Sequence, residues 1–246
     1  MDDDSALDVL RGAADTLARD AAGELHRAVP AYPEWSVADL VVHTGGIHRW
    51  VTHIVETRAT QRPSQPDIDR RPDDLIAWFE AGARGVADVL AACPPSTDVW
   101  TFAGERTARF WRRRMALETT IHRWDVQQAV DRPAPIADDV AAAGVTEALE
   151  VYLGPRSRDT AVGGGGEVVV LRAADGTRAW AVRLHSDAIE VVSADHAGDV
   201  VVTGTSARLW LFLMGRVPGT ALAVRGPTAV SERLERAIAG LEPPSR

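Results

Sequence analysis

The chain has 246 residues, of which 46% are hydrophobic and 25% are charged, the composition of a soluble globular protein. Its formal net charge of −8 disfavours nucleic acids and anionic membrane surfaces as partners, because both are bound through clustered positive charge. The single cysteine, Cys93, excludes an intrachain disulfide and a cysteine-rich zinc site.

The N-terminus, MDDDSALDVL, lacks the basic start and the long apolar run of a secretion signal. No stretch approaches the roughly 20 apolar residues that are needed to span a bilayer. These features predict a cytoplasmic protein that works without a membrane.

The first half of the chain predicts four helices. Ser5 can cap the first, whose apolar residues recur at helical spacing until Pro30. The stretch EWSVADL begins the second helix, with Ser36 as the N-cap and Asp39 in the capping-box position. In both helices the apolar residues follow the spacing of three and four that places them on one face.

The third helix is expected to start near Pro72, with Asp73 and Asp74 in its first turn, where the helix dipole favours acidic side chains. It stops at the sequence CPP. The fourth helix runs from about Glu105 to Val130. Four helices of this length with modest connections predict an up-down-up-down bundle.

The second half of the chain has a different pattern. The segment 131–139 contains two prolines and predicts a connection, and a helix around Ala137–Tyr152 follows it. Next come short β-rich runs separated by turns, EVVVLRA, RAWAVRLH, AIEVVSA and GDVVVTG, before helices return at TSARLWLFLMGR and PTAVSERLERAIAGL. The predicted fold class is therefore α+β, with a four-helix bundle over residues 1–132 and a small α+β domain with an antiparallel sheet over residues 137–246.

Two helices of the predicted bundle carry ionisable side chains on their apolar faces. In the second helix, the inward row consists of Leu40, His43, Ile47, Trp50 and Ile54. In the fourth helix it consists of Trp111, Met115, Glu118, His122, Val126 and Ala129. Positions four apart project side by side, with Cβ atoms roughly 5–6 Å apart, so Glu118 and His122 can converge in the bundle core.

A divalent cation held by His43, Glu118 and His122 explains a carboxylate in an apolar row, where an unpaired one is costly. Two imidazoles and one carboxylate leave the fourth tetrahedral position open, which is the arrangement of catalytic zinc. The cores of helical bundles are known places for such sites.

Structural explanations of the same residues stay open from the spacing alone. A histidine on an apolar face is more often bonded to a carbonyl than to a metal. Glu118 and His122 could form an i,i+4 ion pair worth a few tenths of a kcal/mol, and Arg114 could pair with Glu118. His48 and His53 lie on other faces of the second helix, where solvent or interhelical packing explains them.

The sequence WSVADLVVHTGGIHRW, followed about sixty residues later by RRMALETTIHRWD, resembles the mycothiol-dependent maleylpyruvate isomerase family. The N-terminal domain of that family belongs to the DinB-like metal-binding four-helix bundles. In the second half, GTSARLWLFLMGR is similar to the family segment G-T-x-x-x-L-x-x-x-L-x-G-R, within a small α+β domain akin to sterol carrier proteins. The resemblance covers nearly the whole chain and implies this two-domain fold.

The resemblance implies that His43, Glu118 and His122 bind Zn²⁺ or another divalent transition metal. It also implies that Arg216, in the recurring Gly-Arg pair, acts in catalysis by holding a substrate carboxylate. As an ordinary basic residue at a helix end, Arg216 would instead interact favourably with the helix dipole. Relatives commonly have a histidine where this chain has Leu117. Adjacent helix positions do not share a face, so this departure leaves the implied metal ligands unchanged.

The implied function is that of an enzyme with mycothiol as its thiol cosubstrate. A zinc-bound thiol would attack a small, electrophilic, anionic substrate, in S-transfer or in thiol-assisted cis–trans isomerisation. The alternatives are a metal-dependent hydrolase or amidase that uses zinc-bound water, and a non-enzymatic small-molecule binding protein. The inward Glu118 argues against a pure carrier, which has no need of a carboxylate there.

Overall fold

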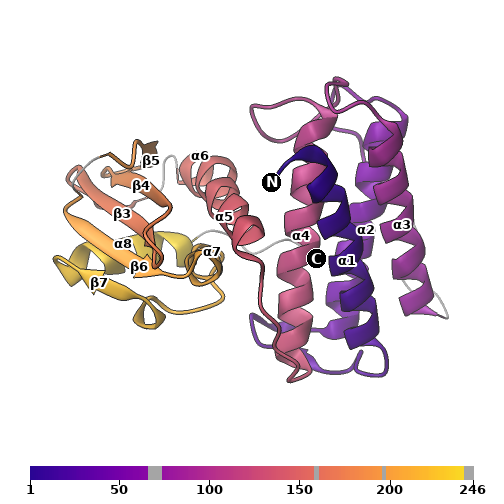
Figure 1. Cartoon of the computed structure of the whole chain (residues 1–246), viewed down its shortest axis with the longest axis horizontal. Helices are drawn as coiled ribbons and strands as arrows, with labels where there is room; N and C mark the ends of the chain where they lie inside the picture. The colour runs from indigo at the N-terminus through magenta and orange to yellow at the C-terminus, as the bar shows by residue number, and fades with distance from the viewer. Residues whose placement is uncertain (66–73, 158–160, 196–197, 241–246) are drawn as a thin grey trace. The chain divides into compact units, whose positions relative to one another are not determined.

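The computed structural model describes residues 1–65, 74–157, 161–195 and 198–240. The chain divides into two compact units, one that ends at Ala134 and one that begins at Pro135 (Figure 1). This boundary lies inside the proline-containing segment 131–139. The end of the predicted second domain, residues 241–246, lies outside the described residues.

The first unit is a bundle of four long helices, which confirms the prediction from the apolar rows (Figure 1). They are α1 (Asp3–Ala21), α2 (Val37–Glu56), α3 (Leu75–Ala92) and α4 (Ala108–Ala129). α1 packs along α4, α2 packs along α3, and α2 also contacts α4. The fully buried side chains of the core include Leu10, Leu17, Leu40, Phe79 and Met115. Each such side chain contributes roughly 1.5–3 kcal/mol on burial, so these apolar faces hold the helices together.

A short antiparallel pair, β1 (Ala28–Val29) and β2 (Tyr32–Ser36), joins α1 to α2. α2 begins with the predicted capping box. Ser36 Oγ accepts a hydrogen bond from Asp39 N at 3.2 Å, and Ser36 N donates to Asp39 Oδ2 at 2.9 Å. These bonds fix the first turn of α2 and thereby the face on which His43 lies.

Two other helix starts differ from the sequence prediction. The N-cap of α1 is Asp2, and Ser5 is the third residue of a capping box with it. For the third helix, the expected first residues Pro72 and Asp73 lie outside the described residues, and Asp74 caps α3 by accepting a backbone hydrogen bond. Both caps are aspartates, whose charge also suits the positive end of the helix dipole.

The second unit is an α+β domain, which confirms the predicted fold class. Its five strands are β3 (Glu167–Ala173), β4 (Ala179–Leu184), β5 (Ile189–Val192), β6 (Val200–Gly204) and β7 (Ala223–Arg225). Its helical segments are α5 (Asp138–Glu147), a π-helix (Ala148–Leu153), α6 (Gly154–Arg156), α7 (Ser206–Leu213), a 3-10 helix (Gly219–Ala221) and α8 (Thr228–Ala239). α7 and α8 both pack against β3 and β6. Among the described helices of the two units, none combines the length and the apolar character of a membrane span.

The sheet is mixed, which corrects the expectation of an antiparallel sheet. Its order is β5-β4-β3-β6-β7, and β3 and β6 run parallel while the other neighbouring pairs are antiparallel. A parallel pair of strands needs a crossover connection, and the connection from β3 to β6 contains β4 and β5. Ala194 and Gly198 of the β5–β6 connection lie against the sheet, so closely that a Cβ on Gly198 would be 2.6 Å from Val170 Cγ2. Apolar alternation shows which face of a strand is buried but does not show which strands are neighbours, so the sequence could not predict this pairing.

Candidate metal centre

The three predicted ligands lie on the sides of α2 and α4 that face each other. His43 is on the second turn of α2, and Glu118 and His122 are one turn apart in the middle of α4. The same faces bury apolar side chains, including Leu40, Met115 and Val126. The three polar groups therefore lie in an otherwise apolar part of the bundle.

The structure brings these three side chains together. One potential ligand atom from each lies within 4.8 Å of those of the other two. Glu118 Oε1 is 3.6 Å from His43 Nε2 and 3.2 Å from His122 Nε2. The side chains of His43, Glu118 and His122 are 11%, 6% and 3% exposed, respectively. Two imidazole nitrogens and a carboxylate oxygen in this arrangement suit zinc and other divalent transition metals.

A buried arginine holds the other oxygen of Glu118. Arg114, one turn earlier on α4, forms an ion pair with Glu118 Oε2 through its Nη2. Both side chains are less than one-tenth exposed, in surroundings where an unpaired carboxylate is costly. The pairing that stayed open in the sequence is therefore present, and it leaves Glu118 Oε1 turned toward the imidazoles.

One buried contact of this site is absent from the sequence prediction. Asp125, three residues after His122 on α4, lies with its Oδ2 3.0 Å from His122 Nδ1. The Asp125 carboxylate is fully buried. The signal that could have indicated this contact is the i,i+3 spacing of histidine and aspartate in HRWD, because such positions are neighbours on a helix surface.

His48, also on α2, contributes to the packing between helices. It is fully buried, and its Nε2 lies 2.9 Å from Thr119 Oγ1 of α4. Burial lowers the pKa of His48 to about 3, and repulsion by the positive charge of Arg49 adds to the effect. The imidazole of His48 is therefore neutral at pH 7, and its contact with α4 is the interhelical packing that the sequence indicates.

Residues 6–127 match the family model of the mycothiol maleylpyruvate isomerase N-terminal domain. Through this domain the chain belongs to the mycothiol-dependent maleylpyruvate isomerase family. The matched residues include His43, Glu118 and His122. No curated protein matches the sequence.

The solved structures that resemble the chain include two of the same enzyme. They are crystal structures of the mycothiol-dependent maleylpyruvate isomerase and of a histidine-to-alanine mutant of that enzyme. The TM-score is 0.64 for both, the sequence identities are 16% and 15%, and the match covers 91% of this chain and 93% of the other. At this identity the likeness shows the fold alone, a helical bundle followed by an α+β unit.

Leu117 stands where the resemblance described above implies a histidine. In this chain its side chain is fully buried in the bundle. A leucine supplies no ligand atom, so the candidate donors beside it remain His43, Glu118 and His122.

Arg216, the predicted catalytic arginine of the family segment, lies in the second unit just after α7. Gly215 adopts a φ of 71° and donates to Phe212 O, and Arg216 N donates to Leu211 O at 2.8 Å, which is a Schellman motif. Arg216 Nη1 donates to Met214 O at 2.7 Å. The backbone turn therefore requires the glycine, and the guanidinium lies where it interacts favourably with the α7 dipole. The catalytic role of Arg216 stays a prediction.

Proposed function

We propose that the chain is a metal-dependent enzyme that uses mycothiol for the cis–trans isomerisation of a small, electrophilic, anionic substrate. The observation that carries this proposal is the buried convergence of His43, Glu118 and His122 within a domain of the mycothiol maleylpyruvate isomerase family. The solved enzymes that share the fold are mycothiol-dependent maleylpyruvate isomerases, which favours isomerisation over S-transfer.

His43, Glu118 and His122 would hold Zn²⁺ or another divalent ion through two imidazole nitrogens and one carboxylate oxygen. A divalent ion bound there would carry more positive charge than the single carboxylate that ligates it neutralises, which would stabilise a thiolate and lower the pKa of a bound thiol. The chain needs no cysteine of its own for this chemistry, and its single cysteine, Cys93, lies at the C-terminal end of α3.

Arg216 would bind a carboxylate of the substrate, because its planar guanidinium can donate two parallel hydrogen bonds to one carboxylate. Thiol-assisted isomerisation joins the sulfur to one carbon of a conjugated cis double bond, allows rotation about the resulting single bond, and then releases the thiol. An arginine that holds one end of the substrate leaves the other end free to rotate. Because Arg216 would hold the substrate by a carboxylate at one end, an anionic substrate suits the chain.

The test is the conversion of maleylpyruvate to its trans isomer by the purified, zinc-loaded protein, with and without mycothiol. We expect turnover only with mycothiol, and we expect the thiol to be recovered unchanged. His122→Ala should lose both zinc and turnover while keeping the circular dichroism of a helical bundle. His53→Ala, which changes a histidine in the last turn of α2 outside the cluster, is the matched control and should keep both.

Other outcomes would assign a different function. Incorporation of the sulfur into the product would indicate an S-transferase on the same metal site. Amide or ester hydrolysis without thiol would indicate a metal-dependent hydrolase that activates water. Absence of stoichiometric zinc, together with unchanged behaviour of His43→Ala, would contradict a metal-dependent enzyme altogether.

A further inference from the structure

The contact between His122 and Asp125 is a hydrogen bond in which one group must donate and the other must accept. An ionised carboxylate only accepts hydrogen bonds, so an ionised Asp125 requires a proton on the Nδ1 that lies 3.0 Å from its Oδ2. The other nitrogen of the same ring, Nε2, lies 3.2 Å from Glu118 Oε1. A metal bound by His43, Glu118 and His122 would take the place of a proton between these two atoms. The two nitrogens of His122 therefore face different groups on α4.

We propose that Asp125 is a positioning residue, which holds His122 as the Nδ1–H tautomer and presents Nε2 to the metal. This inference rests on the proposed function, because it assumes that His43, Glu118 and His122 bind a metal. Histidine ligands of metals commonly donate their second N–H to a carboxylate or carbonyl, which fixes the ring and raises the basicity of the ligating nitrogen. Asp125 gives His122 such a partner from the same helix, less than one turn away.

The contrast with His48 shows why the chemistry of the partner matters. His48 is equally buried, but its Nε2 meets the hydroxyl of Thr119 at 2.9 Å. A hydroxyl can either donate or accept, so this contact does not select one tautomer. A carboxylate does select one. The bundle therefore pairs an acceptor-only group with the candidate ligand and an ambivalent group with the core histidine.

Burial strengthens the effect of Asp125. The side chains of both His122 and Asp125 are at most 3% exposed, so water competes little for the Nδ1 proton. A buried carboxylate is also costly to keep unless it accepts hydrogen bonds. The His122–Asp125 bond therefore stabilises the carboxylate and orients the imidazole at the same time.

Two substitutions separate the acceptor from its charge. Asp125→Leu removes the acceptor, so the ring of His122 loses the bond that orients it. Asp125→Asn keeps the shape and an acceptor oxygen but removes the negative charge. Outer partners of metal ligands typically contribute 10- to 100-fold to metal affinity. We therefore expect Asp125→Leu to bind zinc about 10- to 100-fold more weakly than the parent, and Asp125→Asn to show a smaller loss of affinity than Asp125→Leu.

The zinc dissociation constants are measured by competition with a chromogenic chelator at one pH, on the full-length chain. The matched control is Thr120→Val, a buried position on the same helix whose hydroxyl donates to Ala116 O of α4. We expect it to keep the parental affinity. Parental affinity in a folded Asp125→Leu protein would overturn the inference while leaving the proposed function intact. Absence of zinc binding by the parent would overturn both.

A spectroscopic measurement covers the case in which Asp125→Leu does not fold. In ¹H–¹⁵N spectra of the zinc-loaded parent, we expect the ring proton of His122 on Nδ1 and no proton on Nε2. The Asp125→Asn variant should shift this Nδ1 proton, because its acceptor has lost its charge, and Thr120→Val should leave it in place. A proton on Nε2 of His122 in the loaded parent would overturn the inference.

Discussion

At the scale of single residues, Glu118 shows how the bundle accommodates a carboxylate in its core. Its Oε2 pairs with Arg114, and its Oε1 faces the imidazoles of His43 and His122. A buried ion pair contributes little net stability, because desolvation offsets the attraction between its charges. Removal of one partner is nevertheless costly, since it leaves the other charge uncompensated.

Arg114→Met is therefore expected to destabilise the metal-free protein. The substitution keeps much of the side-chain volume and leaves the Glu118 carboxylate buried without the guanidinium. Breaking such a pair lowers the free energy of unfolding by about 3–5 kcal/mol. Zinc should restore more stability to the variant than it adds to the parent, because the ion supplies the missing positive charge. Chemical denaturation with a chelator present, and then with zinc, measures both quantities.

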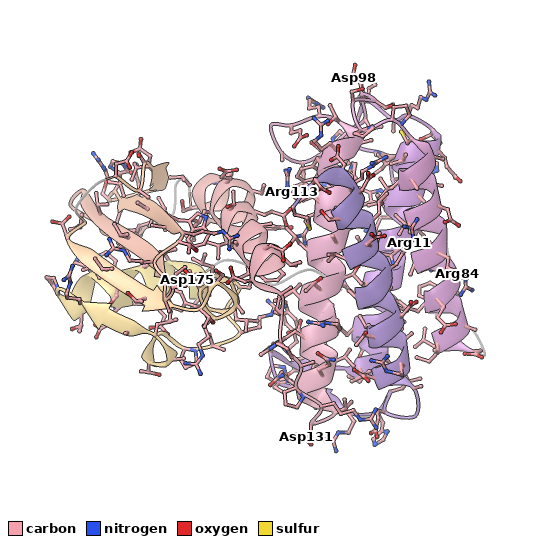
Figure 2. All side chains as sticks on the ribbon, in the orientation of Figure 1. Arg11, Arg84, Asp98, Arg113, Asp131 and Asp175 are labelled. Atoms are coloured by element: carbon pink, nitrogen blue, oxygen red, sulfur yellow. The ribbon has the colours of Figure 1, made fainter. Side chains whose placement is uncertain are left out.

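The neighbouring arginine on α4 provides the matched control. Arg113, labelled in Figure 2, pairs with Glu105 at 3.1 Å, and both of these side chains are one-third exposed. Ion pairs of this kind contribute roughly 0–1 kcal/mol, so Arg113→Met should change the free energy of unfolding by no more than that. Equal losses in Arg113→Met and Arg114→Met would contradict the special role given to the buried pair.

At the scale of secondary-structure elements, α2 and α4 are held together by polar as well as apolar contacts. His48 of α2 reaches Thr119 of α4, one residue from the candidate ligand Glu118. Because burial lowers the pKa of His48 from 6.5 to about 3, the folded chain disfavours the protonated imidazole. The unfolded chain binds this proton more readily than the folded chain. The contribution of neutral His48 to the free energy of unfolding is therefore fully present above pH 6.5 and is lost progressively as the pH falls toward 3.

His48→Gln should remove this part of the acid sensitivity. Between pH 7 and pH 5 the titration of His48 alone lowers the free energy of unfolding by roughly 2 kcal/mol, and glutamine does not titrate. Glutamine can still meet the Thr119 hydroxyl, so the packing of α2 on α4 is largely kept. Urea unfolding of the metal-free parent and variant at the two pH values checks this. An identical loss in the two proteins would show that His48 does not carry the effect.

The same two helices show how far the sequence could predict the site. The inward rows were predictable because apolar residues repeat every three and four positions, and the Ser36 cap fixes where α2 begins. The division of the Glu118 oxygens between Arg114 and the imidazoles was not predictable, since it depends on side-chain rotamers rather than on spacing. The parallel pairing of β3 and β6 was not predictable either, because it depends on which strands become neighbours.

At the scale of the whole molecule, the proposed chemistry is divided between two compact units. The three candidate metal ligands lie in the unit that ends at Ala134, and Arg216 lies in the unit that begins at Pro135. The family model covers residues 6–127 and therefore the ligands but not the arginine. Metal binding and substrate binding should accordingly respond to different substitutions.

Arg216→Met is expected to leave the zinc affinity unchanged and to lower kcat/KM for an anionic substrate. Loss of a hydrogen bond to a charged group costs about 1.5–3 kcal/mol, which corresponds to roughly a 10- to 150-fold decrease. Arg208→Met is the matched control, because Arg208 is another arginine of the α7 region whose Nη1 donates to a backbone carbonyl, that of Ala221. Zinc titration and steady-state kinetics on the three proteins separate the two roles of Arg216. If kcat/KM falls equally in both variants, the structural contact of Arg216 with the end of α7 is enough to account for its effect. In that case another residue binds the substrate carboxylate.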